Sequence, residues 1–185
     1  AVPSGVDWNS LDSQWLRFQQ FEPLWKQGSD FSLVDFGCGY GAMYEYFQKR
    51  KLQVKYRGYD ISKSMLDAGR RKFTNDKNCS FFEGVQQIPI SDFTVASGIF
   101  NVKLDEEELE WEQYIKTTIK QLASLSAHGV GFNFLTDYSD EDKKRPDLYY
   151  ASPEDMFSWC IENFGRKVQL IHDYPLYEFT ILVRL

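Results

Sequence analysis

Three glycines at alternate positions, Gly37, Gly39 and Gly41, have the spacing in this sequence that most directly implies chemistry. They lie in the segment VDFGCGYGAMYEYF, residues 34–47, between an apolar run and a pattern typical of a helix. Glycines in such a turn let the backbone bend tightly and approach a ligand, and the first turn of the following helix offers unpaired N–H groups. The segment is therefore predicted to bind a ligand through its main chain.

An aspartate, Asp60, follows the glycine segment by roughly 20 residues, at the predicted end of the next strand. At that place a carboxylate can accept hydrogen bonds from both ribose hydroxyls of a nucleoside. A second aspartate, Asp35, precedes Gly37 and would repel a pyrophosphate, whereas it would attract an ammonium or sulfonium group. The loop also reads G-C-G-Y-G instead of the dinucleotide pattern G-x-G-x-x-G. The sequence therefore favours a sulfonium nucleoside, with a nicotinamide-dependent enzyme as the weaker alternative.

The elements that must position these residues follow from the hydrophobic pattern. Short apolar or β-branched runs alternate with stretches that have apolar residues every three to four positions. This alternation predicts an α/β fold with a mostly parallel sheet and helices on both faces, in which ligands bind beyond the carboxyl ends of the strands. We expect strands at 32–37, 54–60, 79–84, 93–99 and 130–136. Helices are expected at 41–51 and 105–129. Two further helices are expected to begin at Lys63, with Ser62 as N-cap, and at Pro153, with Ser152 as N-cap.

The longest predicted helix carries signals for both of its ends. Asp105 and Glu108 have the spacing of a capping box, and Gly129 is placed to follow the last helical turn. His128, beside that glycine, is expected to cap the terminal carbonyl groups of the helix.

The elements at the two ends of the chain are predicted separately from this alternating core. The last two apolar runs, KVQLIHDY and YEFTILVRL, are separated by a turn too short for a parallel crossover, so they are predicted to form an antiparallel hairpin. Residues 1–28 are predicted to form an N-terminal helical segment that breaks or kinks at Pro23. We expect one domain over residues 1–185, with the alternating core at 29–185.

The composition limits the classes of partner. The net charge of −6 is opposite to what binding to a nucleic-acid backbone requires, and no apolar run approaches the roughly 20 residues of a membrane span. We therefore expect no nucleic acid, no membrane and a cytoplasmic location. Cys38, Cys79 and Cys160 lack metal-binding spacing and are expected to stay reduced. The sequence begins with Ala1 rather than methionine, which indicates processing, trimming or a cloned fragment.

These residues together resemble the class I S-adenosylmethionine (SAM)-dependent methyltransferases. VDFGCGYG resembles their first motif, YRGYDIS their acid at the end of the second strand, FFEGV the segment that borders the adenine, and FTVASGIFN their fourth strand. The resemblance covers nearly the whole chain from the first predicted strand onward. It implies a Rossmann-like, seven-stranded, mostly parallel sheet that ends in an antiparallel hairpin, with SAM as the cofactor.

The resemblance also implies roles for individual residues. The backbone of the glycine loop would cradle the methionine portion of SAM, Asp35 would lie near its amino group, and Asp60 would hold its ribose. Many relatives carry an acid where this chain has Val85, so adenine recognition would fall to the backbone there or to Gln86. The cofactor-binding residues implied in this way are Asp35, Gly37, Cys38, Gly39, Gly41, Asp60, Ile61, Met65, Gly84, Val85, Gly98 and Phe100.

The acceptor site is predicted from the loops over the same edge of the sheet. Transfer of a methyl group from a sulfonium needs alignment above all, and an oxygen or protonated amine acceptor also needs a base. His172 and Asp137 are the catalytic candidates, although a structural role for either remains an alternative. The segment 137–152 is longer than ordinary connections and is a candidate lid. The predicted substrate-binding residues are Trp8, Asn101, Tyr138, Arg145 and Tyr149.

The predicted function is therefore SAM-dependent methyl transfer to an oxygen or nitrogen atom of a small molecule. The tetrapeptide [DNS]-P-P-[YFW] of amino-methylating enzymes is absent, since SGIFN stands in its place, which argues against methylation of adenine N6 or a glutamine amide. A SAM-binding regulatory subunit without activity of its own is the alternative. We expect no metal and a monomer or homodimer.

Overall fold

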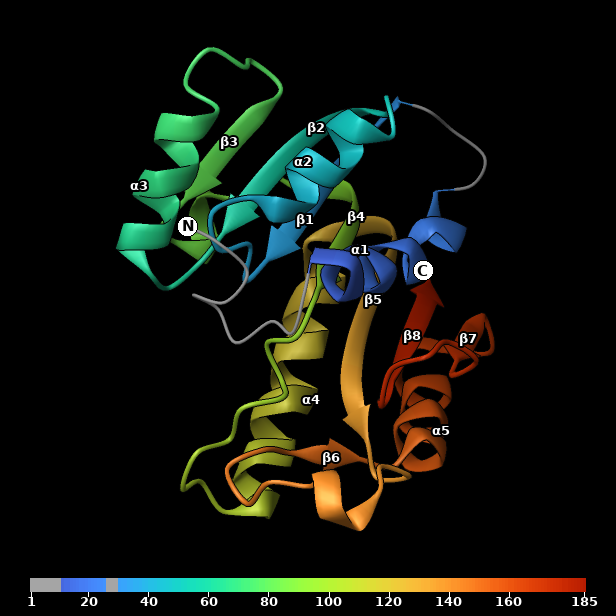
Figure 1. Cartoon of the computed structure of the whole chain (residues 1–185). Helices are drawn as coiled ribbons and strands as arrows, with labels where there is room; N and C mark the ends of the chain where they lie inside the picture. Colours follow the sequence, from blue (N-terminus) through green and yellow to red (C-terminus); the bar gives the residue numbers. More distant parts are fainter. Residues whose placement is uncertain (1–10, 26–29) are drawn as a thin grey trace.

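The structure is a computed structural model, and it describes residues 11–25 and 30–185. Strands and helices alternate along the core, as the hydrophobic pattern predicted (Figure 1). The strands are β1 (Asp30–Phe36), β2 (Gln53–Tyr59), β3 (Cys79–Phe82), β4 (Ser91–Ala96), β5 (Ser126–Thr136), β6 (Tyr150–Ala151), β7 (Val168–Ile171) and β8 (Glu178–Arg184). The helices are α1 (Leu11–Gln20), α2 (Ala42–Lys49), α3 (Lys63–Lys72), α4 (Glu108–Ser124) and α5 (Pro153–Phe164), with short 3-10 turns η2 (Glu22–Leu24), η3 (Val85–Gln87) and η4 (Glu141–Lys143).

The strands form one sheet whose main path has the order β3-β2-β1-β4-β5-β8-β7. The pairs from β3 to β5 along this path are parallel, whereas β8 runs antiparallel to both β5 and β7. The two-residue strand β6 lies off this path and pairs with the end of β5. The predicted seven-stranded, mostly parallel sheet with an antiparallel C-terminal hairpin is confirmed.

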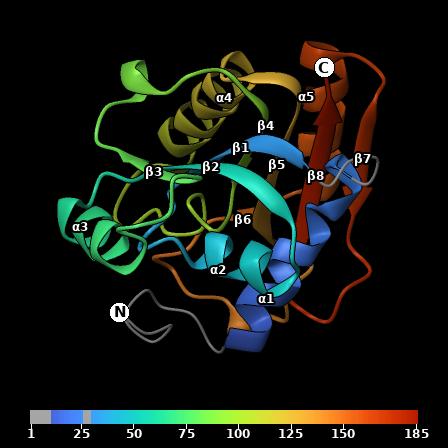
Figure 2. The same ribbon diagram turned by 90° about the horizontal axis from the view of Figure 1, so that it is seen from above.

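Helices cover both faces of the sheet, as Figure 2 shows when the molecule is seen from above. Helices α4 and α5 pack on one face, and α1, α2 and α3 lie on the other. Side chains alternate between the two faces along a strand, so β1 sends Val34 and Phe36 into one core and Leu33 into the other. The same alternation buries Asp35, between them, on the α2 side, where Tyr56 meets it.

The strand order reverses beside β1, which pairs with β2 on one side and with β4 on the other. In open parallel sheets this reversal opens a crevice beyond the carboxyl ends of the two central strands. The segments that follow β1, β2 and β4 therefore meet at one edge of the sheet. They contain the glycine loop, Asp60 and residues 97–101.

The predicted limits of the long helix were wrong. Helix α4 begins at Glu108 after an N-cap, Glu107, that makes no side-chain capping bond, so there is no capping box at Asp105. Gly129 does not end the helix but lies inside β5, where a Cβ atom would come within 2.7 Å of the carbonyl oxygen of Val183 in β8, so the packing of the two strands requires a glycine. His128 is exposed in the same strand, with Nε2 3.7 Å from Asp92 Oδ1, and caps no helix.

The other predicted helix ends agree more closely with the structure. Ser152 caps α5 through its Oγ, which accepts a hydrogen bond from the N–H of Asp155 over 3.2 Å. Ser62 occupies the N-cap of α3, although its side chain makes no capping bond. The break at Pro23 is confirmed, since α1 ends before it and the proline lies in η2. None of the helices within residues 11–25 and 30–185 combines the length and the apolar character needed to cross a bilayer.

Candidate functional site

The glycine loop connects β1 directly to α2. Gly37 and Gly39 have positive φ angles of 85° and 55°, a region that residues with side chains rarely adopt. A Cβ atom at Gly37 would lie 2.2 Å from Cγ2 of Ile99, in the segment after β4, so packing also requires a glycine there. At Gly39 a Cβ atom would have no neighbour within 4 Å, because this part of the backbone borders open space.

Asp60 lies against this loop. Its Oδ2 accepts a hydrogen bond from the N–H of Gly39 over 2.8 Å, and its Oδ1 accepts one from the N–H of Ser62 over 2.8 Å. The carboxylate thus joins the loop to the start of α3. The structure brings together the two features, glycines and acid, that the sequence singled out.

Asp35 is buried beneath the loop, with 3% of its surface exposed. The hydroxyl of Tyr56, in β2, donates a hydrogen bond of 2.6 Å to its Oδ2. Burial raises the pKa of Asp35 to about 7; the Tyr56 bond opposes this shift, and the charge of Asp60 adds to it. Burial and the two nearby carboxylates also raise the pKa of the Cys38 thiol, so this cysteine stays protonated and is not a nucleophile.

A cavity of about 290 Å³, here called the glycine-loop cavity, lies at this edge of the sheet. Met65 and Gly98 line it from α3 and from the segment after β4. It is also lined by residues that the sequence analysis did not name, Gln14 and Phe18 of α1 and Ser97 directly after β4. The predicted cofactor residues that line it are Asp35, Gly37, Cys38, Gly39, Asp60, Met65 and Gly98.

The remaining predicted cofactor residues lie around this cavity rather than in its lining. Gly41 is buried at the N-cap of α2, where a Cβ atom would meet Phe73 and Phe81 at 3.0 Å. Ile61 follows Asp60 and is 92% exposed, while Gly84 and Val85 form the half-exposed start of η3. Phe100 is fully buried and packs on Phe132 and Phe134 in the core.

A second cavity, of about 480 Å³, adjoins the first, because Gly98 lines both. Two predicted substrate residues, Asn101 and Arg145, line this second cavity. Tyr150 of the candidate lid lines it as well, and so does Tyr177, which sequence reasoning missed. Tyr149, which was predicted, is buried instead, and its N–H donates a hydrogen bond to the carbonyl oxygen of Asn101 over 2.9 Å.

The candidate lid, residues 137–152, forms a wall of the second cavity. It is tied to the segment after β4 by a bridge between Val102 and Leu148 and by hydrogen bonds from the N–H groups of Lys103 and Leu104 to Asp147. These bonds hold Asn101 beside the wall. These contacts therefore fix residues 137–152 against the segment after β4, which also contains Gly98.

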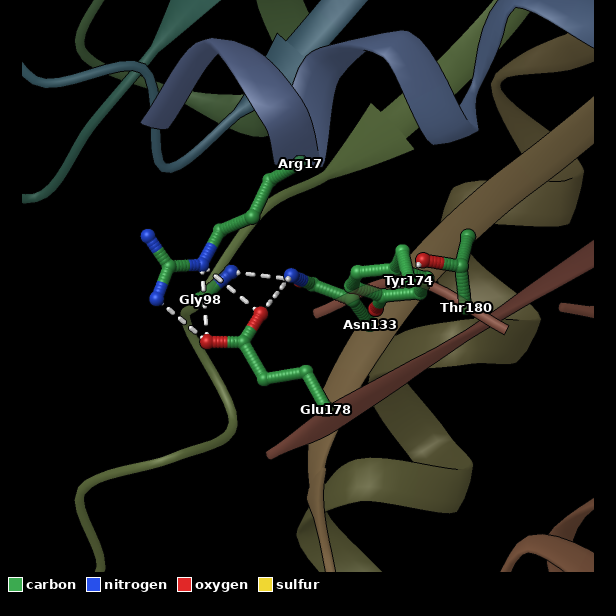
Figure 3. A network of polar contacts seen from close by, with 6 residues as sticks. All are labelled: Arg17, Gly98, Asn133, Tyr174, Glu178 and Thr180. Carbon is green, nitrogen blue, oxygen red and sulfur yellow. Dashed lines mark hydrogen bonds and ion pairs between the residues drawn. The ribbon is translucent and has the colours of Figure 1, made fainter. Parts of the chain in front are cut away.

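A buried polar network connects α1 to the boundary between the two cavities (Figure 3). Nε of Arg17 donates to both carboxylate oxygens of Glu178, at 2.8 and 2.7 Å, and its Nη2 pairs with Oε1. The side-chain amide of Asn133, in β5, donates to Glu178 Oε2 over 3.0 Å, and its Oδ1 accepts the N–H of Gly98 over 2.8 Å. In the sequence, the one indication of this network is that a charged residue, Glu178, stands at the start of a largely apolar strand.

The catalytic candidates lie together but outside the linings of both cavities. His172 and Tyr138 are exposed, with their ring centroids 6.0 Å apart, and the Tyr138 hydroxyl donates to Glu154 over 2.7 Å. Desolvation, with the charge of Glu154 adding to it, raises the pKa of the neighbouring Asp137. Trp8, the remaining predicted substrate residue, lies outside the described residues.

Three buried oxygens at the cavities lack a hydrogen-bond partner among the described residues. They are Oε1 of Gln14 and Oγ of Ser97 in the glycine-loop cavity, and Oδ1 of Asn101 at the second cavity. Buried acceptors of this kind call for donors from a ligand or from water. With bare backbone at Gly39 and a buried carboxyl at Asp35, the first cavity fits a nucleoside that carries an ammonium group. Within residues 11–25 and 30–185, no group of three or more His, Cys, Asp or Glu side chains is placed to hold a metal ion.

Comparison with known proteins agrees with this geometry. The family described as "Methyltransferase domain" matches residues 33–125. The chain is 44% identical over 154 residues, covering 83% of this chain and 93% of the relative, to "Putative methyltransferase Rv1506c" of Mycobacterium tuberculosis (strain ATCC 25618 / H37Rv).

Solved structures of methyltransferases share the fold. Magnesium protoporphyrin IX methyltransferase (ChlM) from Synechocystis PCC 6803, with bound S-adenosylhomocysteine (SAH), superposes with a TM-score of 0.63 at 15% identity, over 94% of this chain and 80% of that one. A SAM-dependent methyltransferase from Aquifex aeolicus superposes with a TM-score of 0.62 at 17% identity, over 93% of this chain and 92% of that one. At such identities the likeness establishes the fold alone.

Proposed function

Because this chain belongs to the class I SAM-dependent methyltransferases, we propose that it transfers the methyl group of SAM to an oxygen or nitrogen atom of a small-molecule acceptor. The observation that carries the proposal is the meeting of two cavities at Gly98. One cavity lies at the glycine loop, where the family binds its cofactor. The other supplies a separate space for an acceptor beside it.

We assign the cofactor to the glycine-loop cavity. When bound, SAM supplies an electrophilic methyl group on a sulfonium, whose positive charge is discharged on transfer. The buried carboxyl of Asp35 would face the ammonium group, and the backbone around Gly39 would border the methionine portion. Asp60, already held by the N–H groups of Gly39 and Ser62, would accept the ribose hydroxyls.

The adenine would lie beyond the ribose, on the side of α3. Met65 lines the cavity there, and the exposed side chain of Ile61 is free to cover a base. The backbone of Gly84 and Val85 would provide the hydrogen bonds to the adenine edge, since no acid follows that glycine. Gly41 supports this site indirectly, because it lets α2 start close to Phe73 and Phe81.

The second cavity is assigned to the acceptor. Its volume of about 480 Å³ is within the roughly 300–1,000 Å³ of small-molecule sites. The unpartnered Oδ1 of Asn101 supports an acceptor that carries an O–H or N–H group, because such a group could donate a hydrogen bond to it. Arg145 and Tyr150 would contact the remainder of the acceptor from the segment 137–152. Alignment of the acceptor with the methyl group would then supply much of the acceleration.

Asp137 and His172 stay the candidates for taking a proton from the acceptor. Both follow strands whose carboxyl ends lie at the same edge of the sheet, and Ser139, close to Asp137 in the chain, lines the second cavity. Desolvation raises the pKa of Asp137, which makes this carboxylate a better base than an ordinary aspartate. Neither side chain lines the cavity, so either would act through a bound water or after a small movement.

The experiment is a transfer assay with methyl-labelled SAM and a panel of hydroxyl- and amine-bearing small molecules, paired with calorimetric titration of SAH. For an acceptor that is methylated, Asn101→Ala and Arg145→Ala should each lower transfer by about tenfold or more, while the affinity for SAH stays within about twofold. Glu141→Ala, an exposed change in the same segment, is the control and should alter neither quantity. Tight SAH binding without transfer to any acceptor would favour the regulatory-subunit alternative.

A further inference from the structure

Helix α1 contributes a buried amide to the glycine-loop cavity. Gln14 is only 3% exposed and lines that cavity, yet its Oε1 has no hydrogen-bond partner among residues 11–25 and 30–185. Ser97, which follows β4 and is 7% exposed, lines the same cavity with an equally unpartnered Oγ. Leaving two buried acceptors unpaired costs stability unless a donor reaches them.

The chemistry of the cavity identifies the donor. Gln14, Ser97 and Asp35 all line this cavity, and their side chains carry three kinds of oxygen: an amide oxygen, a hydroxyl oxygen and a carboxyl oxygen. An ammonium group carries three N–H donors and no acceptor, so it matches such a set of oxygens. In SAM and SAH only the amino-acid end carries an ammonium group.

Helix α1 is held firmly enough for this role. Gln14, Arg17 and Phe18 follow one another at helical spacing on one side of α1. Arg17 forms the buried ion pair with Glu178, and Phe18 packs edge-on against Tyr46 of α2, with ring centroids 5.7 Å apart. The helix is therefore fixed to both the sheet and α2.

We propose that Gln14 binds the amino-acid end of SAM through its side-chain oxygen, and that helix α1 thereby completes the cofactor site. The inference rests on the assignment of the glycine-loop cavity to SAM. It adds an element that lies outside residues 33–125, the part matched by the methyltransferase-domain family. Ser97 would accept from the same ammonium group as a second new contact.

The test compares two ligands that differ at the amino-acid end. SAH carries that end, whereas 5′-methylthioadenosine has the adenine, ribose and sulfur but lacks it. Both are titrated into the full chain by calorimetry, with the wild type and Gln14→Met, in which a side chain of similar length cannot accept the bond. We expect Gln14→Met to weaken SAH binding about tenfold and to leave methylthioadenosine binding within about twofold.

The control is Gln19→Met, an exposed position on the same helix, which should change neither affinity. Unaltered SAH affinity in Gln14→Met, or an equal loss for both ligands, would overturn the assignment of Gln14. A wild-type chain that binds neither ligand would instead overturn the assignment of the cavity itself. If Gln14→Met fails to fold, as judged by circular dichroism, Gln14→Leu provides the same comparison.

Discussion

The carboxylate of Asp60 accepts a hydrogen bond of 2.8 Å from the backbone N–H of Gly39, 21 residues earlier in the sequence. This bond joins the acid at the end of β2 to the loop at the end of β1, two neighbouring parallel strands. It places the proposed ribose contact and the proposed methionine contact on the same small cavity. The relationship leads to predictions for both residues.

Gly39→Val should weaken SAH binding by tenfold or more, because the new side chain would project into the open space that the backbone borders. The positive φ angle at Gly39 adds strain of roughly 1–2 kcal/mol to the folded state. Gly165→Val is the comparison, since Gly165 also has a positive φ angle and open space but ends α5. Calorimetry and urea unfolding should find a loss of stability in both variants and a loss of affinity only in Gly39→Val.

Asp60→Asn should lower SAH affinity by about tenfold or more, because an amide cannot accept from both ribose hydroxyls as a carboxylate does. The side chain keeps its shape, so the fold should persist. Asp67→Asn, a half-exposed change in α3, is the comparison and should leave the affinity unchanged. Equal affinities of Asp60→Asn and the wild type in calorimetry would contradict the ribose assignment.

The stability of the ligand-free protein should depend on the ionisation of Asp35. Its pKa is raised from 3.8 to about 7 in the folded state, so the folded protein binds a proton at Asp35 more tightly than the unfolded chain does. The resulting stabilisation is complete below pH 3.8 and is lost as the pH rises to about 7. The slope approaches roughly 1.4 kcal/mol per pH unit within this interval.

Urea unfolding of the wild type and of Asp35→Asn at several pH values between 4 and 8 measures this contribution. The variant cannot titrate at this position. The unfolding free energy of the wild type, relative to that of the variant, should therefore be highest at low pH and fall as the pH rises. A difference that does not vary with pH would show that Asp35 is ionised throughout.

The buried pair of Arg17 and Glu178 should be more sensitive to loss of one partner than to loss of both. Glu178→Gln leaves the Arg17 guanidinium buried opposite a neutral amide and should cost roughly 3 kcal/mol of unfolding free energy. The double variant Arg17→Met/Glu178→Met should recover part of that loss, because no charge remains buried. Asp67→Asn, at the half-exposed pair with Arg70, should have a much smaller effect.

The unfolding free energies of the wild type, Arg17→Met, Glu178→Met and the double methionine variant form a double-mutant cycle. A cycle that gives no coupling between the two positions would contradict the ion pair as the anchor of α1. Circular dichroism of each variant checks that the sheet is retained.

Local patterns in the sequence were sufficient for the fold and for the glycine loop and the acid of the proposed cofactor site. The alternation of strand and helix patterns, the glycines of the loop and Asp60 all depend on interactions between residues close in the chain or on strands that pair in a standard order. The short turn before the last strand determined the antiparallel hairpin in the same way. Where a local signal competed with a distant one, as at Gly129, the approach of β8 decided the outcome and the predicted helix cap was wrong.

The tertiary structure alone decided which distant residues complete the site. Arg17 and Glu178 are 161 residues apart in the sequence, and no periodicity in either segment specifies that they meet. The positions of Gln14 in the first cavity and of Tyr150 and Tyr177 in the second depend likewise on how α1, the lid segment and the hairpin pack across the sheet. The sequence therefore determined the backbone frame of the proposed cofactor site, because strand and helix periodicity and turn chemistry are local, whereas packing between remote elements determined what closes it.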